Sequence, residues 1–196
     1  MKNTNEKNKP RSLGSVFVSI LLALTLVACN GGDTQENPPS STDTSKPADP
    51  IETFFSESAI PEARALGEVL KTAQPGETVR VTGQIGGTVK PFGEDFAIFM
   101  LADESLTFCN EMAVPDHCPT PWDACCEPPE KLRKNRTVVQ LSNAAGEVIP
   151  VDLKGRQGLQ ELKRITLEGT LVQREDDGSF FIEGKRIYAP QTAELQ

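Results

Sequence analysis

Five segments of alternating apolar residues constrain the fold of this chain more than any other feature. They are residues 77–87, 94–103, 136–143, 164–175 and 179–189. Alternation with a period of two places every second side chain on one face, as in a β-strand with one buried face. Segment 94–103 is apolar on both faces, and Asp176-Asp177-Gly178 is a hairpin turn signal between the last two segments. We therefore predict a mainly β domain with five strands.

Two other segments have helical spacing. Apolar residues at positions 63, 66, 69 and 70 follow Pro61, and proline is typical of the first turn of a helix. The residues RQGLQELKR at 156–164 are a shorter helix candidate between the third and fourth predicted strands. Glycines inside the first and fourth strands mark positions where a strand must bend sharply. Three strands, a helix and two strands is the order of the five-stranded OB barrel.

Three stretches strengthen this interpretation. GETVRVTGQIGG, AIFMLADES and ITLEGTLVQREDDGSFFIEGKRI resemble the first, second, and fourth to fifth strands of bacterial OB-fold proteins. The whole chain also resembles uncharacterised bacterial lipoproteins that carry a Cys-rich TPWD-x-CC segment in such a barrel, a resemblance that implies no known activity. The expected fold is a five-stranded OB-like barrel with an N-terminal helix, a short helix between strands 3 and 4, and a Cys-rich insertion between strands 2 and 3.

Residues 1–28 have the pattern of a secretory signal peptide. Four basic residues precede the apolar run SLGSVFVSILLALTLVAC, which is short for the roughly 20 residues that cross a bilayer. Its end, Leu26-Val27-Ala28-Cys29, resembles the lipobox of bacterial lipoproteins, which implies that Cys29 is acylated and starts the mature chain. The residue after Cys29 is Asn30 rather than Asp, and under the enterobacterial sorting rule this implies that the lipoprotein is sent to the outer membrane. We expect a protein of the bacterial cell envelope, lipid-anchored on the periplasmic face of the outer membrane, with the bilayer as its partner through Cys29.

The chain then divides into a tether and a domain. Residues 29–58 comprise Cys29 and an acidic linker that is nearly all Gly, Pro, Ser, Thr, Asn and acid as far as Pro50, and is therefore expected to be disordered. Phe54 and Phe55 either dock on the domain or belong to the linker. The predicted domain covers residues 59–190, includes a Cys-rich loop at 108–130, and is followed by a tail at 191–196.

The Cys-rich loop contains four of the five cysteines, the only histidine and the only tryptophan. With Cys29 lipidated, Cys109, Cys118, Cys125 and Cys126 form an even set in an exported chain, which favours two disulfides and no cofactor. A bond between the vicinal cysteines would close a strained ring, so Cys109 and Cys118 would each pair with one of them, in either order. Each closed loop would stabilise by about 3 kcal/mol. The five prolines of the loop are expected to prevent regular structure.

A metal site is the alternative for the same loop. Four thiolates, or three with His117, suit tetrahedral zinc, although C-x8-C-x6-C-C lacks the paired C-x2-C spacing of zinc ribbons. Cys109, Met112, His117 and Cys118 supply the soft donors that suit Cu(I), so the cofactor of this alternative is zinc or copper. A thiol-redox role for the Cys125-Cys126 pair is disfavoured because the flanking Asp123 and Glu127 destabilise a thiolate.

Charge argues against a nucleic-acid partner. The net charge is −8, and removal of residues 1–28, with four of the 20 basic and one of the 28 acidic residues, leaves −11. Residues 91–130 contain nine acids and no Lys or Arg, whereas single-strand binders combine stacking aromatics with a basic groove. The basic cluster KLRKNR at 131–136 is expected to be a solvated entrance to the third strand or a partner for those acids, and a local phosphate or acidic-lipid contact stays open.

These observations favour a binding protein over an enzyme. With one histidine, any nucleophile-histidine dyad would have to use His117, and no phosphate-cradling glycine motif precedes a helix. We predict a membrane-anchored extracytoplasmic binding or interaction module whose disulfide-stapled acidic loop presents Trp122 to an unknown envelope protein or small ligand. The alternative is a periplasmic metal-binding or thiol-redox protein, and binding of single-stranded nucleic acid or oligosaccharide is less favoured.

Overall fold

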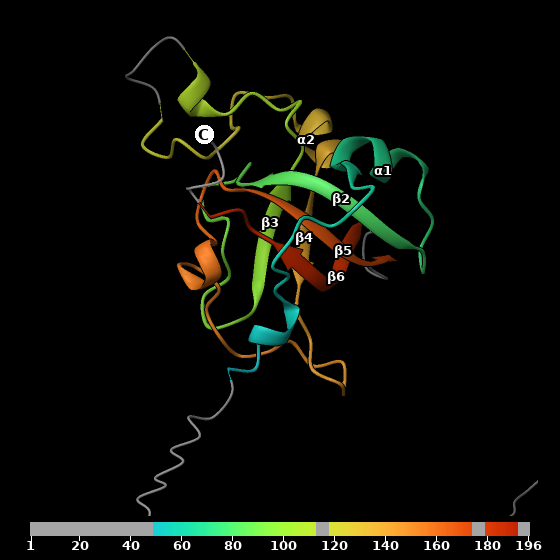
Figure 1. Ribbon diagram of the computed structural model, residues 1–196. Helices are drawn as coiled ribbons and strands as arrows, with labels where there is room; N and C mark the ends of the chain where they lie inside the picture. Colours follow the sequence, from blue (N-terminus) through green and yellow to red (C-terminus); the bar gives the residue numbers. More distant parts are fainter. Residues whose placement is uncertain (1–48, 113–117, 174–178, 192–196) are drawn as a thin grey trace, which may run out of the picture. The chain divides into compact units, whose positions relative to one another are not determined.

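Six strands form one mixed β-sheet in the part of the chain that the structure describes (Figure 1). The structure is a computed structural model, and it describes residues 49–112, 118–173 and 179–191. The strands are β1 (Arg64–Ala65), β2 (Thr78–Ile85), β3 (Ile98–Ala102), β4 (Arg136–Gln140), β5 (Arg164–Gln173) and β6 (Phe180–Tyr188). Strands β2 to β6 fall within the five predicted segments, so the mainly β prediction is confirmed. All of them lie within one compact unit, Ser45–Gln196.

The strand pairings close a cycle. The hydrogen-bonded order is β1-β2-β3-β4-β6-β5, and β5 also pairs with β2. The β2–β5 pair is antiparallel and runs from Thr78↔Thr170 to Gln84↔Arg164. The β4–β6 pair is parallel. Strands β2, β3, β4, β6 and β5 are therefore each hydrogen-bonded to two others of the five.

The alternation seen in the sequence is also the alternation of burial. In β2 the odd-numbered positions from Val79 to Ile85 are buried, while the residues between them are exposed or half-buried. Gly169 in β5 is required by the close approach of β6, because a Cβ there would lie 2.5 Å from the backbone oxygen of Glu183. The β5–β6 register shifts between Glu168 and Gly169, as at a β-bulge, so this glycine marks the irregularity expected from the sequence.

The segment before β1 packs on the sheet. Ile51 is 1% exposed and belongs to the main hydrophobic core, and Phe54 and Phe55 pack against that core while partly buried. A 3-10 turn, Glu52–Phe54, carries them. The sequence allowed these phenylalanines either to dock on the domain or to belong to the linker. The structure shows that they dock on the domain.

The N-terminal helix begins later than predicted. Helix α1 covers Leu66–Thr72, because Arg64 and Ala65 instead pair in parallel with Val81 and Thr82 of β2. Glu62 has a positive φ of 59°, which no helix residue adopts. Pro61 is therefore outside the helix that the sequence assigned to it.

The prediction of a helix between the third and fourth predicted strands is wrong, apart from a single turn. Only a 3-10 turn, Arg156–Gly158, forms there, and the left-handed φ angles of Gly155 and Gln157 (82° and 47°) prevent an α-helix. Leu159 then turns into the core, where it is fully buried.

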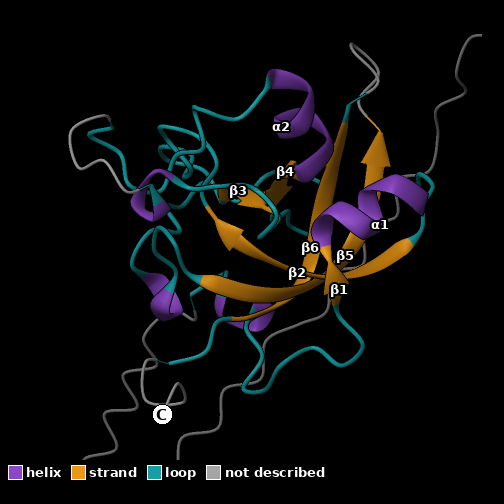
Figure 2. Ribbon diagram, turned by 90° about the horizontal axis from the view of Figure 1, so that it is seen from above, coloured by secondary structure: helices purple, strands orange, loops and turns teal. Residues whose placement is uncertain are grey.

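A helix occurs where the prolines were expected to prevent one. Helix α2 covers Pro129–Asn135 and starts with proline in its first turn, where the missing N–H costs nothing. Glu130 lies in the first turn, and Arg133 and Lys134 lie in the last, which suits the helix dipole. Helices α1 and α2 lie beside each other on one side of the strands (Figure 2). The predicted signal peptide, Cys29, the linker up to residue 48 and His117 lie outside the described residues.

Candidate metal centre

The Cys-rich loop shares a small hydrophobic cluster with the end of β3 and the segment that follows it. Phe108 is fully buried, and it packs in a cluster separate from the main core. Leu132 of α2 and Leu162 pack against this cluster from outside the loop. The buried members of the cluster are Ala102, Leu106, Phe108 and Ala124. The loop is therefore held by side-chain packing at both of its ends.

Backbone hydrogen bonds bring the two halves of the loop together. The Cys109 N–H donates to the Asp123 carbonyl at 2.8 Å, and the Asn110 N–H donates to the Pro121 carbonyl at 3.0 Å. The Trp122 carbonyl accepts a hydrogen bond of 2.8 Å from the N–H of Gly87, just beyond β2. These bonds position Cys109 opposite the Cys125-Cys126 pair.

Three cysteine sulfurs converge on one point. The Sγ atoms of Cys109, Cys118 and Cys125 all lie within 4.8 Å of one another. Cys125 Sγ is 3.1 Å from Cys118 Sγ and 3.7 Å from Cys109 Sγ. Cys126 Sγ lies 4.0 Å from Cys125 Sγ. No disulfide joins these four cysteines in the structure, so the two disulfides remain a prediction.

The neighbouring sulfurs separate the thiol pKa values. Hydrogen bonding with Cys109 and Cys125 raises the pKa of Cys118 to about 12. Hydrogen bonds from Cys118 and Cys109 lower the pKa of Cys125, because they stabilise its thiolate. Hydrogen bonding with Cys125 raises the pKa of Cys126. Cys125 therefore loses its proton before Cys118 and Cys126 do.

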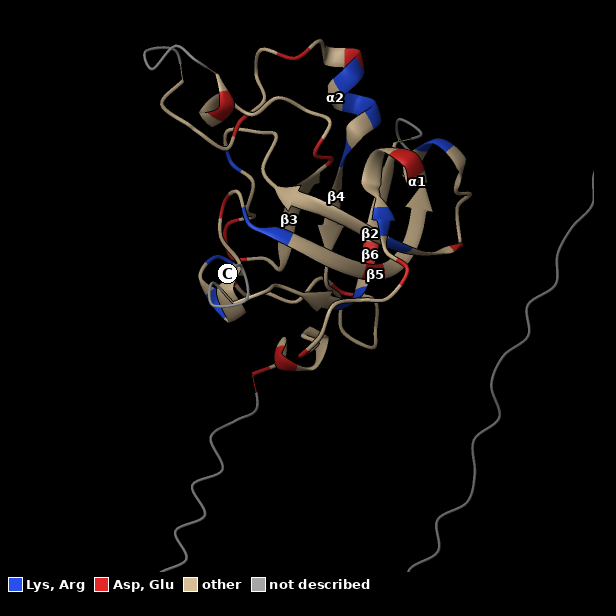
Figure 3. Cartoon of the chain, turned by 45° about the horizontal axis from the view of Figure 1, so that its top comes forward, with Lys and Arg blue, Asp and Glu red and all other residues tan. Residues whose placement is uncertain are grey.

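The acids of the loop affect the thiols less than the sequence suggested. The charge of Asp123 does raise the pKa of Cys125, but this effect is smaller than that of the thiol hydrogen bonds. The Glu127 carboxylate is used elsewhere, since it accepts hydrogen bonds from the Thr107 N–H at 2.8 Å and from Lys131 Nζ at 2.7 Å. Figure 3 shows acids in the Cys-rich loop and basic residues along α2. Lys131 is thus one of the partners that the sequence expected for these acids.

Two other candidate residues of the loop, Met112 and Trp122, lie among the described residues. Met112 is exposed, and its N–H donates to the Cys109 carbonyl at 3.3 Å. Trp122 donates its Nε1–H to the Val89 carbonyl at 3.0 Å, and Lys154 Nζ lies 5.9 Å from the centre of its ring. The tryptophan therefore fastens the loop to the connection after β2, a structural role that the sequence did not indicate.

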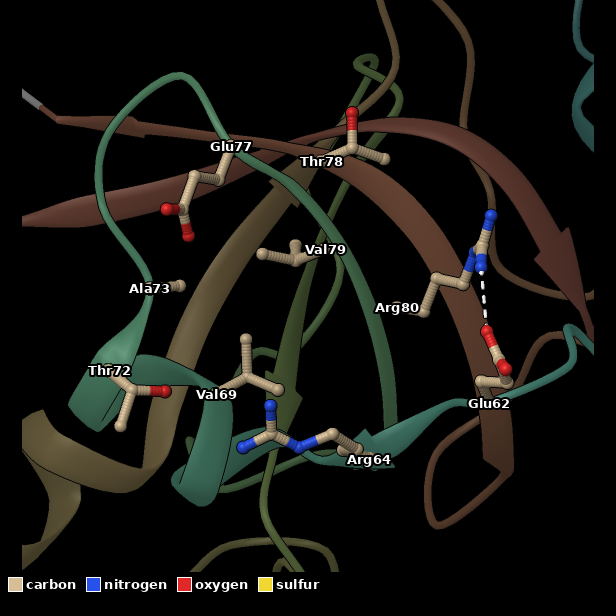
Figure 4. Close-up of a pocket in the computed structure, with 9 residues that line it drawn as sticks. All are labelled: Glu62, Arg64, Val69, Thr72, Ala73, Glu77, Thr78, Val79 and Arg80. Carbon is tan, nitrogen blue, oxygen red and sulfur yellow. Dashed lines mark hydrogen bonds and ion pairs between the residues drawn. The ribbon is translucent and has the colours of Figure 1, made fainter.

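A separate hollow of about 360 Å³ lies between α1 and β2 (Figure 4). Its charged side chains already have partners: Arg80 is 3.3 Å from Glu62 and 2.7 Å from Glu168, and Arg64 is 3.9 Å from Glu68. Glu77 accepts a hydrogen bond of 3.0 Å from the Gln74 N–H. Its lining contains two acidic and two basic side chains, with no excess of either sign, which makes it a weaker site than the sulfur cluster.

A comparison with protein-family models and a comparison with curated proteins find no match for this chain. Within residues 49–112, 118–173 and 179–191, no helix combines the length and the apolar character needed to cross a bilayer. What the chain binds must therefore be inferred from its own residues and their geometry.

Proposed function

We propose that this chain is a metal-binding protein of the bacterial cell envelope. Cys109, Cys118 and Cys125 bind one thiophilic ion, and Cys126, whose Sγ is 4.0 Å from that of Cys125 but outside the group of three, is the candidate for a fourth ligand. The observation that carries this proposal is the convergence of three sulfurs within 4.8 Å. Ligands at 2.3 Å from a tetrahedral zinc ion are about 3.8 Å apart. Cys125 Sγ lies 3.7 Å from Cys109 Sγ and 4.0 Å from Cys126 Sγ, close to that value, and 3.1 Å from Cys118 Sγ, which is below it.

The donor set selects the class of metal. Thiolates are soft ligands and suit Zn²⁺ and Cu(I), whereas Mg²⁺ and Ca²⁺ prefer oxygen. Because the pKa of Cys125 is lowered, its thiolate is available first, and the proton of Cys118 is displaced last. Acids near the loop raise the local concentration of cations.

The scaffold is proposed to be a five-stranded OB-type barrel made of β2 to β6. Its support is the cyclic pairing of β2, β3, β4, β6 and β5, which agrees with the resemblance of the sequence to bacterial OB-fold proteins. In this barrel the Cys-rich loop is an insertion between the second and third strands, β3 and β4. The rigid strands on either side hold the loop in place.

Attachment to the membrane is proposed from the sequence. The apolar run and the lipobox-like LVAC make Cys29 the acylated first residue of the mature chain. Replacement of Cys29 with alanine should abolish incorporation of a radiolabelled fatty acid. Undiminished labelling would contradict the proposed anchor.

A metal titration tests the sulfur site. The experiment uses the chain from residue 30 onward, which retains every described element, in reduced form and without oxygen. This protein should bind one Co²⁺ per chain and show thiolate-to-cobalt charge-transfer absorption. Addition of Zn²⁺ or Cu(I) should displace the cobalt. Cys118→Ser should weaken binding by more than the roughly 10–100-fold that an outer-shell contact contributes. The matched control is Met112→Leu, which should leave the affinity unchanged. An equal loss in this control would show that the ligand set is wrong.

A disulfide-stapled binding module is the second candidate. It is favoured by the proximity of Cys118 and Cys109 to Cys125, together with the oxidising compartment expected for an exported chain. Intact mass and metal content of chain purified without reductant separate the two. An intact mass lower by one hydrogen per cysteine, with no metal bound, would contradict the metal proposal. Free thiols with one bound metal ion would contradict the disulfide proposal.

A further inference from the structure

A groove with a volume of about 720 Å³ lies between the two helices and the strands. It is within the size range of small-molecule sites and is distinct from the sulfur cluster, since no cysteine lines it. Helices α1 and α2 form its sides, and β3, β4 and the start of β6 form its floor. Among its lining residues are Leu70, Lys71, Met100, Lys134, Arg136 and Val138.

The floor of the groove is apolar. Met100 of β3 and Val138 of β4 are register partners, and both side chains point away from the main core. Leu70 of α1 and Phe180 of β6 extend this surface on either side. All four side chains are half-buried, so they remain accessible to a ligand.

The rim of the groove is basic. Lys71 lies in the last turn of α1, Arg133 and Lys134 lie in the last turn of α2, and Arg136 starts β4. No Asp or Glu lines the groove, although the chain has 28 acids and a net charge of −8. This concentration of positive charge is therefore opposite in sign to the rest of the molecule.

Much of this charge is available to a ligand. In the described part of the chain, Lys71 and Lys134 form no ion pair within 4.0 Å, and neither does Arg136, which donates to the Gly87 carbonyl. Arg133 is 3.5 Å from Glu130, but both side chains are exposed, and such pairs are weak. An incoming anion therefore displaces little.

We propose that this groove binds a single-chain amphiphile with an anionic head, either a carboxylate or a phosphate monoester. The head lies among Lys71, Lys134 and Arg136, and the alkyl chain covers Met100 and Val138. The chain's own acidic linker is a poorer occupant, because residues 30–48 contain only an alanine to place on an apolar floor. A single nucleic-acid strand is also disfavoured, because Phe180 is the single aromatic among the lining residues and a stacking platform needs several.

Calorimetry with short amphiphiles tests the proposal on the chain from residue 30 onward. Octyl phosphate and octanoate should both bind, and at least about tenfold more tightly than octyl glucoside, which has the same alkyl chain and no charge. Octyl phosphate should also bind more tightly than butyl phosphate. Equal affinity for octyl glucoside would overturn the anionic head, and equal affinity for butyl phosphate would overturn the alkyl site.

Two variants connect binding to the groove. Lys134→Glu should weaken octyl phosphate binding at least about tenfold, while Lys185→Glu, an exposed β6 lysine outside the groove, should not. Met100→Gln should remove the preference for octyl over butyl phosphate. Thermal unfolding must show that each variant is folded. An equal loss of octyl phosphate affinity in Lys185→Glu would overturn the site. The proposal would also be overturned if the protein bound phosphatidylglycerol vesicles or oligothymidylate but not octyl phosphate.

Discussion

Replacing Asp103 with alanine should loosen the junction that holds α1 against α2. The Asp103 side chain is 6% exposed, and it accepts hydrogen bonds from the N–H of Gly67 at 2.6 Å and of Ser105 at 2.9 Å. Its own N–H donates to the Asn135 carbonyl at the end of α2, at 2.8 Å. One residue therefore links the first turn of α1, the end of β3 and the end of α2.

The size of the effect follows from these contacts. The alanine variant leaves the Gly67 N–H buried without a partner, while exposed Ser105 can turn to water. A hydrogen bond to a charged group contributes about 1.5–3 kcal/mol, and a buried unpaired donor costs about 1–3 kcal/mol. We expect the free energy of unfolding to fall by about 3 kcal/mol at pH 7.

The effect should also depend on pH. Burial raises the pKa of Asp103, but the hydrogen bonds from Ser105 and Gly67 outweigh it and lower the pKa overall. A carboxyl group with a lower pKa in the folded state stabilises the fold fully above its unfolded pKa, about 3.9. That contribution is lost as the pH falls through the folded pKa. The difference between wild type and Asp103→Ala should therefore shrink in acid.

Urea unfolding at pH 7 and at about pH 3 measures both effects. The matched control is Asp152→Ala, because Asp152 is exposed and accepts one hydrogen bond of 2.7 Å from the Asp95 N–H. This control should cost less than about 1 kcal/mol. A loss for Asp103→Ala no larger than that of the control, or a loss that grows in acid, would refute the reasoning.

Three further predictions follow from the described contacts. In the reduced, metal-free chain, Cys125 should react with iodoacetamide before Cys126 and Cys118, because the pKa of Cys125 is lowered while those of the other two are raised; peptide mass mapping of a time course would reveal the opposite order. Gly169→Ala should lower the free energy of unfolding by about 1–3 kcal/mol, since the new Cβ would lie 2.5 Å from a β6 backbone oxygen; a neutral result in urea would show that the strands relax. Trp122→Phe should cost about 1 kcal/mol and speed hydrogen exchange at Gly87, because it removes the hydrogen bond to Val89; unchanged exchange would argue against this anchor.

The strands were predictable because burial in them depends on local alternation alone. Val79, Val81 and Ile85 face the core for the same reason that they alternate in the sequence. Helix α2 was missed because Pro128 and Pro129 were interpreted as helix breakers, although a proline in the first turn starts a helix. The signal that could have identified it was an acid near its start and basic residues near its end.

The two candidate sites differ in how far the sequence could indicate them. The sulfur cluster joins residues of one loop, so Cys109, Cys118 and Cys125 were identified as one site, while its geometry depends on backbone pairing that no spacing rule gives. The groove brings Lys71 together with Arg133 and Lys134 across a long separation in the chain. Only the packing of α1 near α2 creates it, so the sequence could show the basic cluster but not the apolar floor beneath it.

The cyclic pairing of the strands has a consequence during synthesis. Strand β2 forms only a short contact with β3, at Gln84↔Ala102 and Ile85↔Leu101, whereas seven of its residues pair with β5, far later in the chain. Strand β4 likewise pairs with β6, the last of the described strands to be made. A growing chain that stops before Arg164 therefore carries two apolar strands with open edges, which are templates for aggregation. C-terminal truncations that remove β5 and β6 should therefore be the variants most prone to form inclusion bodies.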